Sequence, residues 1–370
     1  VTILKIKPDG ELIDYKGILQ TQETDLFLNY YYAINTDNND NIYIGGSFSK
    51  PVDFLTFINK EQELIAKSTW KYTSAVAHSK SARRIDATRK QLIKNIQSSK
   101  KKIIDIKNGY NGDTEYQTKI VQYLDFCEKS INEEYDKIIN MQEVAEQSYD
   151  AMEAYLMMRD LVNKKIDEEN DKAELAFKEF ALKYNITITN QESELSKKIA
   201  ISGKVFDYHT ALYLIFFKTN ITDLNLSLAI EKKDLGAIQQ NASALLLYSE
   251  EGLEKIKAIQ PYSNDSSMLT ATKKCLEFYK KEAETFVPKI VDFYMFNEKF
   301  ENARKSMENK SAKDRTKEEI DSYNGMVKQV NKEIENYNKM NSANFQEKST
   351  VVNTWNSTGD NFISKHVPVN

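Results

Sequence analysis

The sequence predicts a mainly α-helical fold: two tandem, duplicated four-helix bundles preceded by a small antiparallel β-segment. Three observations support this. The first 50 or so residues are rich in β-forming side chains and hold four of the eleven Gly. From about residue 53, apolar side chains recur every three or four positions, which is the period of an amphipathic helix. Parts of the helical region also repeat 152 positions later, and such a repeat indicates a duplicated helical unit.

The β-segment is predicted from alternating residues and turn signals. Residues 1–7 alternate, Pro8-Asp9-Gly10 is typical of a turn, and residues 11–19 can return as a second strand. A second hairpin is expected from residues 33–36 and 42–48. The Asn- and Asp-rich turn between them begins like a calcium loop but lacks the required Gly and Glu, so a plain turn is favoured over a calcium site.

The duplication is clearest where residues 123–129 (YLDFCEK) align with residues 275–281 (CLEFYKK). The loop 109–114 aligns with 261–266 in the same register. The alignment extends back without a gap to Ala77, which aligns with Ala229. We therefore expect residues of about 70–141 to superpose on residues 222–293.

The helical period predicts four helices in each copy. The segment between Gly112 and Gly203 holds neither Gly nor Pro, so long helices are unobstructed there. The residues 185–202 are expected to form a linker, with a short strand possible at 186–189. Three domains follow: residues 1–52, 53–202 and 203–370. The predicted helices are 54–80, 83–108, 114–146, 148–184, 206–231, 234–259, 266–308 and 316–347, the last opened by a capping box at Thr316.

Composition and motifs exclude several classes of function. The formal charge of −4 on 370 residues argues against a general nucleic-acid binder. No apolar run reaches the length of a transmembrane helix. None of the three histidines has a carboxylate three residues before it, and no nucleophile or phosphate-loop motif is present. We therefore predict no enzyme and no catalytic, cofactor-binding or metal-binding residue. Cys127 and Cys275 are expected to be separate buried thiols.

The second helix of the first copy is strongly basic. Residues 80–102 hold nine Lys or Arg and one acid, whereas the matching residues 232–254 hold two Lys and four acids. One interpretation is a solvated face paired with acidic neighbours. The other is contact with an anionic surface, such as lipid headgroups, an acidic glycan or a protein. The candidate contact residues are Arg83, Arg84, Arg89, Lys90, Lys94, Lys100, Lys101 and Lys102.

The last predicted helix carries Asn324, Asn331 and Asn338 at heptad spacing beside an apolar seam. Such a row can bond a neighbouring helix and fix its register, which is favoured over a ligand groove. Trp355 and Phe362 are expected to close the end of the bundle.

Several segments resemble a family of helical bacterial surface lipoproteins of unassigned activity, which occurs in spirochaetes and Bacteroidota. These are Tyr123-Leu124-Asp125-Phe126, residues 135–142, residues 177–185, Leu276-Glu277-Phe278-Tyr279, and the closing Trp355 with His366-Val367-Pro368. The resemblance covers residues of about 55–370 and implies export and association with the outer membrane. The chain shows no lipid-attachment Cys. Residues 1–50 resemble one blade of a bacterial β-propeller repeat.

Together these patterns predict a non-enzymatic envelope or surface protein that acts by binding or scaffolding a protein or glycan partner. The alternative is an accessory helical domain of a larger β-propeller-containing enzyme or adhesin. Because the chain starts at Val1 within a predicted strand, we expect that larger part to lie upstream. A membrane-perturbing protein is disfavoured because no predicted helix is apolar enough to insert.

Overall fold

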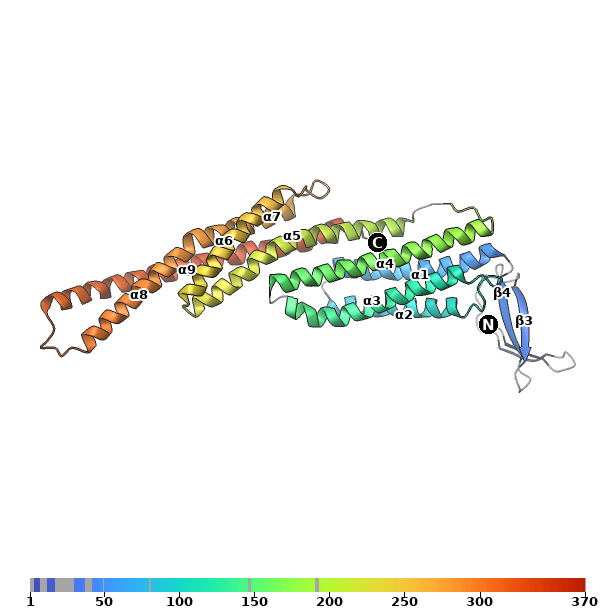
Figure 1. Ribbon diagram of the computed structural model, residues 1–370, viewed down its shortest axis with the longest axis horizontal. Helices are drawn as coiled ribbons and strands as arrows, with labels where there is room; N and C mark the ends of the chain where they lie inside the picture. Colours follow the sequence, from blue (N-terminus) through green and yellow to red (C-terminus); the bar gives the residue numbers. More distant parts are fainter. Residues whose placement is uncertain are drawn as a thin grey trace. The chain divides into compact units, whose positions relative to one another are not determined.

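The computed structural model describes residues 3–6, 12–16, 30–36, 42–48, 50–79, 81–145, 148–189 and 193–369. The described chain is mainly α-helical, as predicted (Figure 1). It forms two compact units. Unit 1 comprises Val1–Ile138 and Met157–Lys197, and unit 2 comprises Ile139–Leu156 and Lys198–Asn370. The turns predicted at residues 8–10 and 37–41, including the calcium alternative, lie outside the described residues.

The strands form two antiparallel pairs. β1 (Ile3–Ile6) pairs with β2 (Leu12–Lys16), and β3 (Tyr30–Thr36) pairs with β4 (Ile42–Phe48). The β3–β4 register places Tyr30 opposite Phe48. The first helix begins three residues after β4, and Pro51 at its first position has the fixed φ that a helix start requires.

Unit 1 has one apolar core to which helices α1 to α4 contribute. Ile58, Ile96, Leu124 and Phe180 are buried in this core, one from each helix in order. Rings of Phe54 and Phe180 lie 5.2 Å apart at one end of it. The helices are α1 (Pro51–His78), α2 (Ala82–Ile104), α3 (Glu115–Ala145) and α4 (Tyr149–Lys183), the last of which starts in unit 2.

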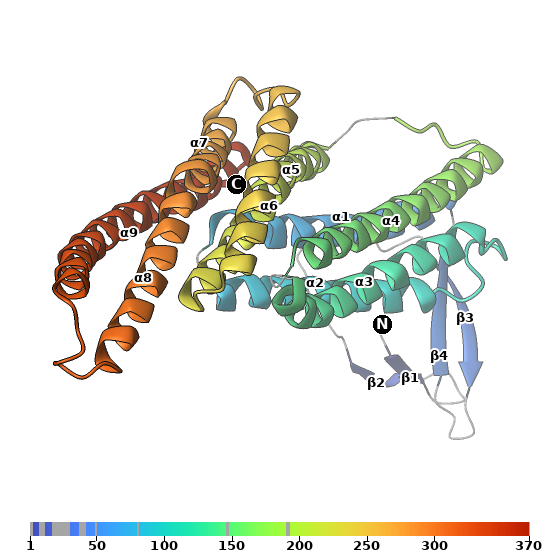
Figure 2. The ribbon, with the colours of Figure 1, turned by 60° about the vertical axis from the view of Figure 1, so that its left-hand side comes forward.

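Besides Ile139–Leu156, unit 2 is formed by the helices that follow (Figures 1 and 2). The predicted capping box at Thr316 is confirmed: its hydroxyl accepts from Glu319 N, and the Glu319 carboxylate accepts from Thr316 N. The elements are α5 (Glu194–Glu231), α6 (Leu235–Lys257), α7 (Ser267–Lys281), the π-helix η1 (Glu282–Phe286), α8 (Val287–Glu308) and α9 (Lys317–His366).

Helix α5 begins at Glu194, twelve residues before the predicted start, so residues 194–202 are not a linker. Ser193 acts as the cap, because its Oγ accepts from Ser196 N at 3.0 Å. The chain then continues through Gly203, which is exposed and tolerated within the helix. The strand alternative at residues 186–189 is wrong, since these residues form neither strand nor helix.

Helix α9 continues to His366, far beyond the predicted end at residue 347. Tertiary packing outweighs the weak helix propensity of its Ser-, Thr- and Asn-rich last third. The Trp355 ring stacks on Phe216 at 4.2 Å, and its Nε1 donates to Thr272 Oγ1 at 3.0 Å. Trp355 and Phe362 are both buried.

The single helix predicted over residues 266–308 is interrupted by η1. Pro288 has no N–H to donate to the carbonyl four residues earlier, which disfavours a regular α-helix at this point. The chain adopts a wider turn instead, in which Val287 N donates to Glu282 O. This turn fixes the position of Glu282, a buried carboxyl described below.

The two units contain matched local features. Short bridges join Tyr110 to Asp113 and Tyr262 to Asp265, 152 positions apart. The capping residues of α2 and α6 are instead 153 positions apart, at Ser81 and Asp234. The predicted gapless offset therefore does not describe the limits of these two helices, because the loop after α6 is one residue shorter than the loop after α2.

Candidate functional site

Helix α2 carries all eight predicted contact residues, and its packing decides which of them reach solvent. Its inner face buries Leu92, Ile96 and Ile103 in the core of unit 1. Its first turn is fixed by Ser81, whose Oγ accepts from Arg84 N at 3.3 Å. Side chains opposite the buried face therefore point away from unit 1.

Four of the predicted residues are held by carboxylates of unit 1. Arg89 is buried, and its guanidinium lies 3.0 Å from Asp86 Oδ1, whose second oxygen lies 2.7 Å from Lys90 Nζ. Hydrogen bonds from Lys90 and Arg89 lower the pKa of Asp86. Lys100 and Lys102 reach acids on other helices. These pairs are Lys100 with Asp125 at 3.0 Å and with Glu128, both on α3, and Lys102 with Glu61 on α1 at 2.8 Å.

Glu61 and Glu128 explain much of the positive charge on α2. Glu61 is buried and needs compensation, which Lys102 and the Ser99 hydroxyl, at 2.7 Å, provide. The hydrogen bond to Glu128 raises the pKa of Lys100 and keeps it charged. For these residues, the interpretation as a face paired with acidic neighbours is correct. The acids that form these pairs lie on the two flanking helices, α1 and α3. Their presence in the sequence was a signal for ion pairing that our sequence analysis did not use.

Ion pairs between α6 and its flanking helices in unit 2 have the opposite polarity. Glu250 of α6 lies 2.8 Å from Lys280 of α7, and Glu251 of α6 lies 3.0 Å from Lys218 of α5. In these ion pairs, α2 supplies the basic side chains in unit 1, whereas α6 supplies the acidic side chains in unit 2. Part of the charge difference between α2 and α6 therefore reflects reversed ion pairs.

The remaining basic residues face solvent. Arg83, Arg84, Lys94 and Lys101 are exposed, and no carboxylate in the described part of the chain forms an ion pair with them. At 100° per residue, positions 83, 90, 94 and 101 lie within about 40° of one another on the helix and span about 27 Å. We call Arg83, Lys90, Lys94 and Lys101 the outward basic row.

The side chains of Cys127, Cys275 and His209 are packed inside the helical units. Cys127 and Cys275 are buried and unpaired, and burial raises the pKa of their thiols to about 11 and about 12. His209 lies 5.6 Å from the Trp355 ring, and burial lowers its pKa. Among the described residues, no three His, Cys, Asp or Glu side chains are grouped so as to hold a metal ion.

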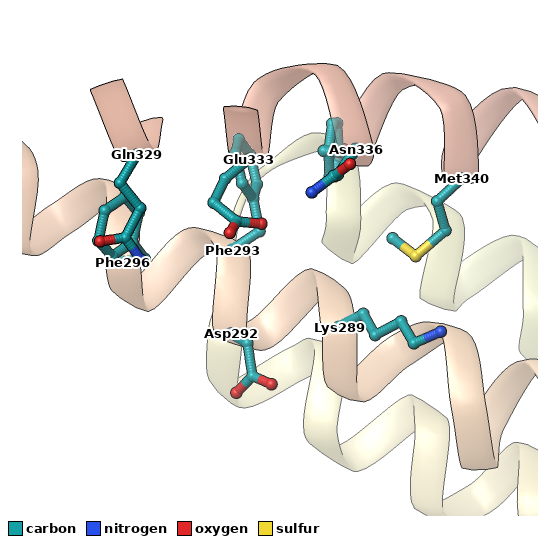
Figure 3. Close-up of a pocket in the computed structure, with 9 residues that line it drawn as sticks. Lys289, Asp292, Phe293, Phe296, Gln329, Glu333, Asn336 and Met340 are labelled. Carbon is teal, nitrogen blue, oxygen red and sulfur yellow. The ribbon is translucent and has the colours of Figure 1, made fainter. Parts of the chain in front are cut away.

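A groove of about 560 Å³ lies between α8 and α9 (Figure 3). Its aromatic floor includes Phe293, which stacks on Tyr337 at 4.4 Å. Charged side chains of both signs form its rim: Lys289 and Asp292 from α8, and Glu333 from α9. The groove is open and its polar groups do not converge on one point, so it defines no specific ligand.

The Asn row on α9 is exposed at all three positions. Within the described residues, no hydrogen bond joins Asn324, Asn331 or Asn338 to a neighbouring helix. The predicted role of this row in fixing helix register is therefore not observed.

The fold and the site define a mainly helical protein with an exposed basic row on α2. No helix in the described part of the chain is long and apolar enough to span a membrane. No protein-family model, no curated protein and no solved structure matches this chain.

Proposed function

We propose that this protein acts by binding rather than by catalysis, and that the outward basic row of α2 contacts an anionic partner. The observation that carries the proposal is the exposure of Arg83, Lys94 and Lys101 on one line, without ion pairs to described residues. Their fields add along the row, and desolvating them against an anionic surface exchanges water for direct ion contacts. The partner class is an acidic glycan, an anionic lipid surface or an acidic protein.

The finer architecture that we propose is a pair of duplicated four-helix bundles behind the β-segment. Matched contacts at one end of each unit support it. Asp113 Oδ2 lies 2.8 Å from Lys183 Nζ and accepts from the Tyr184 hydroxyl at 3.2 Å. Asp265 Oδ2 lies 2.7 Å from Lys365 Nζ and 2.9 Å from His366 Nε2. In both units, an Asp before one helix binds a Lys and an aromatic residue at the end of another.

A location at the cell envelope or surface is proposed from the lipoprotein-family resemblance of residues 55–370. In that setting, an exposed basic face would meet anionic lipid headgroups or glycans directly. The alternative, an accessory domain of a larger propeller-containing protein, is favoured by the β3–β4 hairpin that leads into α1. In either case the helical units serve as a scaffold, and α2 provides the contact.

The test replaces three charges of the row. We expect the Arg83→Glu/Lys94→Glu/Lys101→Glu variant to lose binding to anionic vesicles or acidic polysaccharide in sedimentation at low salt. It should stay folded, since exposed substitutions usually change stability little. Lys90 is left in place because it pairs with Asp86 beside the buried Arg89.

A matched control is available on α9. Lys328, Lys332 and Lys339 are exposed and have the same spacing as Lys90, Lys94 and Lys101. Their triple change to Glu alters the net charge equally and should leave binding intact. Equal recovery of both variants and the natural protein, or equal losses in both variants, would show that the row is only a solvated face.

A further inference from the structure

Two buried carboxyl side chains face a partly buried lysine where α5, η1 and α9 meet inside unit 2. Lys348 of α9 lies 2.6 Å from Asp223 Oδ1 of α5 and 2.9 Å from Glu282 Oε1 of η1. Asp223 and Glu282 are 2% and 1% exposed, so water does not screen their charges. All three residues belong to unit 2.

The other groups around the cluster are uncharged. The Asn344 amide of α9 donates to Glu282 Oε1 at 2.6 Å, and Ser227 of α5 lies 3.5 Å from Lys348 Nζ. The Tyr279 hydroxyl of α7 donates to Asn220 at 2.9 Å rather than to a carboxylate. On the adjacent surface, Lys281 Nζ forms an ion pair with Glu347 Oε2 at 2.8 Å. α6 and α8 contribute no ion pair or hydrogen bond to the cluster among the described contacts.

Two buried carboxylates therefore face one ammonium group. If both carboxyls are ionised, one negative charge is uncompensated, and burying such a charge is costly. One oxygen, Glu282 Oε2, is also buried without a hydrogen-bond partner. Lys348 Nζ contacts one oxygen of each carboxyl, so the two carboxyl groups lie close together, and a proton on either one would remove the uncompensated charge.

The matching position of unit 1 shows that a helix can pack there without a buried carboxyl. Ser130 stands 152 positions before Glu282 and is buried in α3, which continues as a regular α-helix without a π turn. The carboxyl, its π-turn and its lysine are therefore features of unit 2. Wide turns of this kind occur frequently at functional sites.

We infer that Asp223 and Glu282 form a binding site for a single proton, which couples the packing of α5, η1 and α9 to pH. With the proton bound between the two carboxyls, Lys348 balances the remaining charge and the site is neutral. Loss of the proton leaves a buried negative charge that pushes the three elements apart. Unit 2 then becomes less stable.

The direction in which pH changes the stability of unit 2 follows from the raised pKa of Asp223. Burial and the neighbouring Glu282 raise the pKa of Asp223 from its ordinary value to about 7. Between the ordinary Asp pKa and this raised pKa, the folded protein keeps the proton on Asp223, whereas the unfolded chain has released it. Stability is fully present below that ordinary value and is lost as the pH rises through the raised pKa near neutrality.

The experiment measures unfolding of the full chain by urea at about pH 5 and about pH 8. We expect the unfolding constant of the natural protein to increase by roughly tenfold or more over this range, since each unit of pKa shift corresponds to a factor of ten. Glu282→Gln should remove most of this increase. Glu347→Gln, which removes an exposed carboxylate on the adjacent surface, should retain it. An increase that is the same in all three proteins would overturn the proposal.

A second measurement does not depend on unfolding. Infrared spectroscopy of the folded natural protein at about pH 6 should show the carbonyl stretch of a protonated carboxyl, at a pH where ordinary carboxyls are ionised. We expect the band to be absent from Asp223→Asn or Glu282→Gln and present in Glu347→Gln. Its absence from the natural protein, or its persistence in both cluster variants, would contradict a shared proton.

Discussion

Lys100, Lys101 and Lys102 are adjacent in the sequence and have three different surroundings. Lys100 contacts α3, Lys102 contacts Glu61 of α1, and Lys101 faces solvent. Successive residues on a helix point about 100° apart, so a run of three charges cannot act as one contact surface. The sequence prediction treated them as one group. The helical period places Lys101 on a different face from Lys100 and Lys102, whereas the acids that pair with these two residues depend on the tertiary structure.

Gly359 of α9 is one position at which the absence of a side chain allows close contact with another helix. An added Cβ would lie 2.9 Å from His209 Nε2, and the His209 ring is confined by Trp355. We expect Gly359→Ala to destabilise the protein by about 1–3 kcal/mol, because the added methyl group would overpack the contact with His209. Urea unfolding measures the change.

Gly325 on the same helix provides the control. No atom lies within 4 Å of a Cβ added there. Gly325→Ala should therefore stabilise α9 by up to about 1 kcal/mol through its higher helix propensity. Equal effects of the two substitutions would contradict the proposed close approach of α9 to α5.

At the scale of helices and strands, most helix positions follow from the sequence, whereas two of their ends do not. The hydrophobic period and the Thr316 capping box correctly predict where α9 starts. Its end depends on Trp355 and Phe362 packing against other helices of unit 2, which local propensity does not contain. The start of α5 was missed for a local reason, because Ser193 is a cap signal that we gave too little weight beside Gly203.

The contact of Asp265 with the end of α9 gives a prediction at this scale. Hydrogen bonds from Lys365, Ser267 and His366 lower the pKa of Asp265 well below its usual range. Stability from this group is present above the ordinary Asp pKa and is lost as the pH falls. Asp265→Asn should cost roughly 1–2 kcal/mol near neutral pH and almost nothing in strong acid.

Urea unfolding as a function of pH measures this difference. Asp207→Asn, which changes an exposed carboxylate on α5, should have little effect at any pH. A loss for Asp265→Asn that stays constant into strong acid would show that the charge of Asp265 does not bind the end of α9.

At the scale of the whole molecule, the two units share contact positions and differ in charge. The near-neutral total of −4 hides a basic central helix in unit 1 and an acidic one in unit 2. Ion pairs within each unit account for part of this difference, and the exposed Arg83, Arg84, Lys94 and Lys101 account for another part. The sequence shows that the segment forming α2 is basic, but the division between paired and exposed residues needed the structure.

Salt dependence of binding tests the central claim most directly. If the row contacts an anionic surface, each contact is screened by salt, so affinity falls as ionic strength rises. Removing one, two and then three charges, by Lys101→Gln, then Lys94→Gln, then Arg83→Gln, should weaken binding and flatten its salt dependence in three successive steps. The Lys328→Gln, Lys332→Gln and Lys339→Gln series should leave both unchanged. A salt dependence that is unaltered by all three changes in the row would contradict the account.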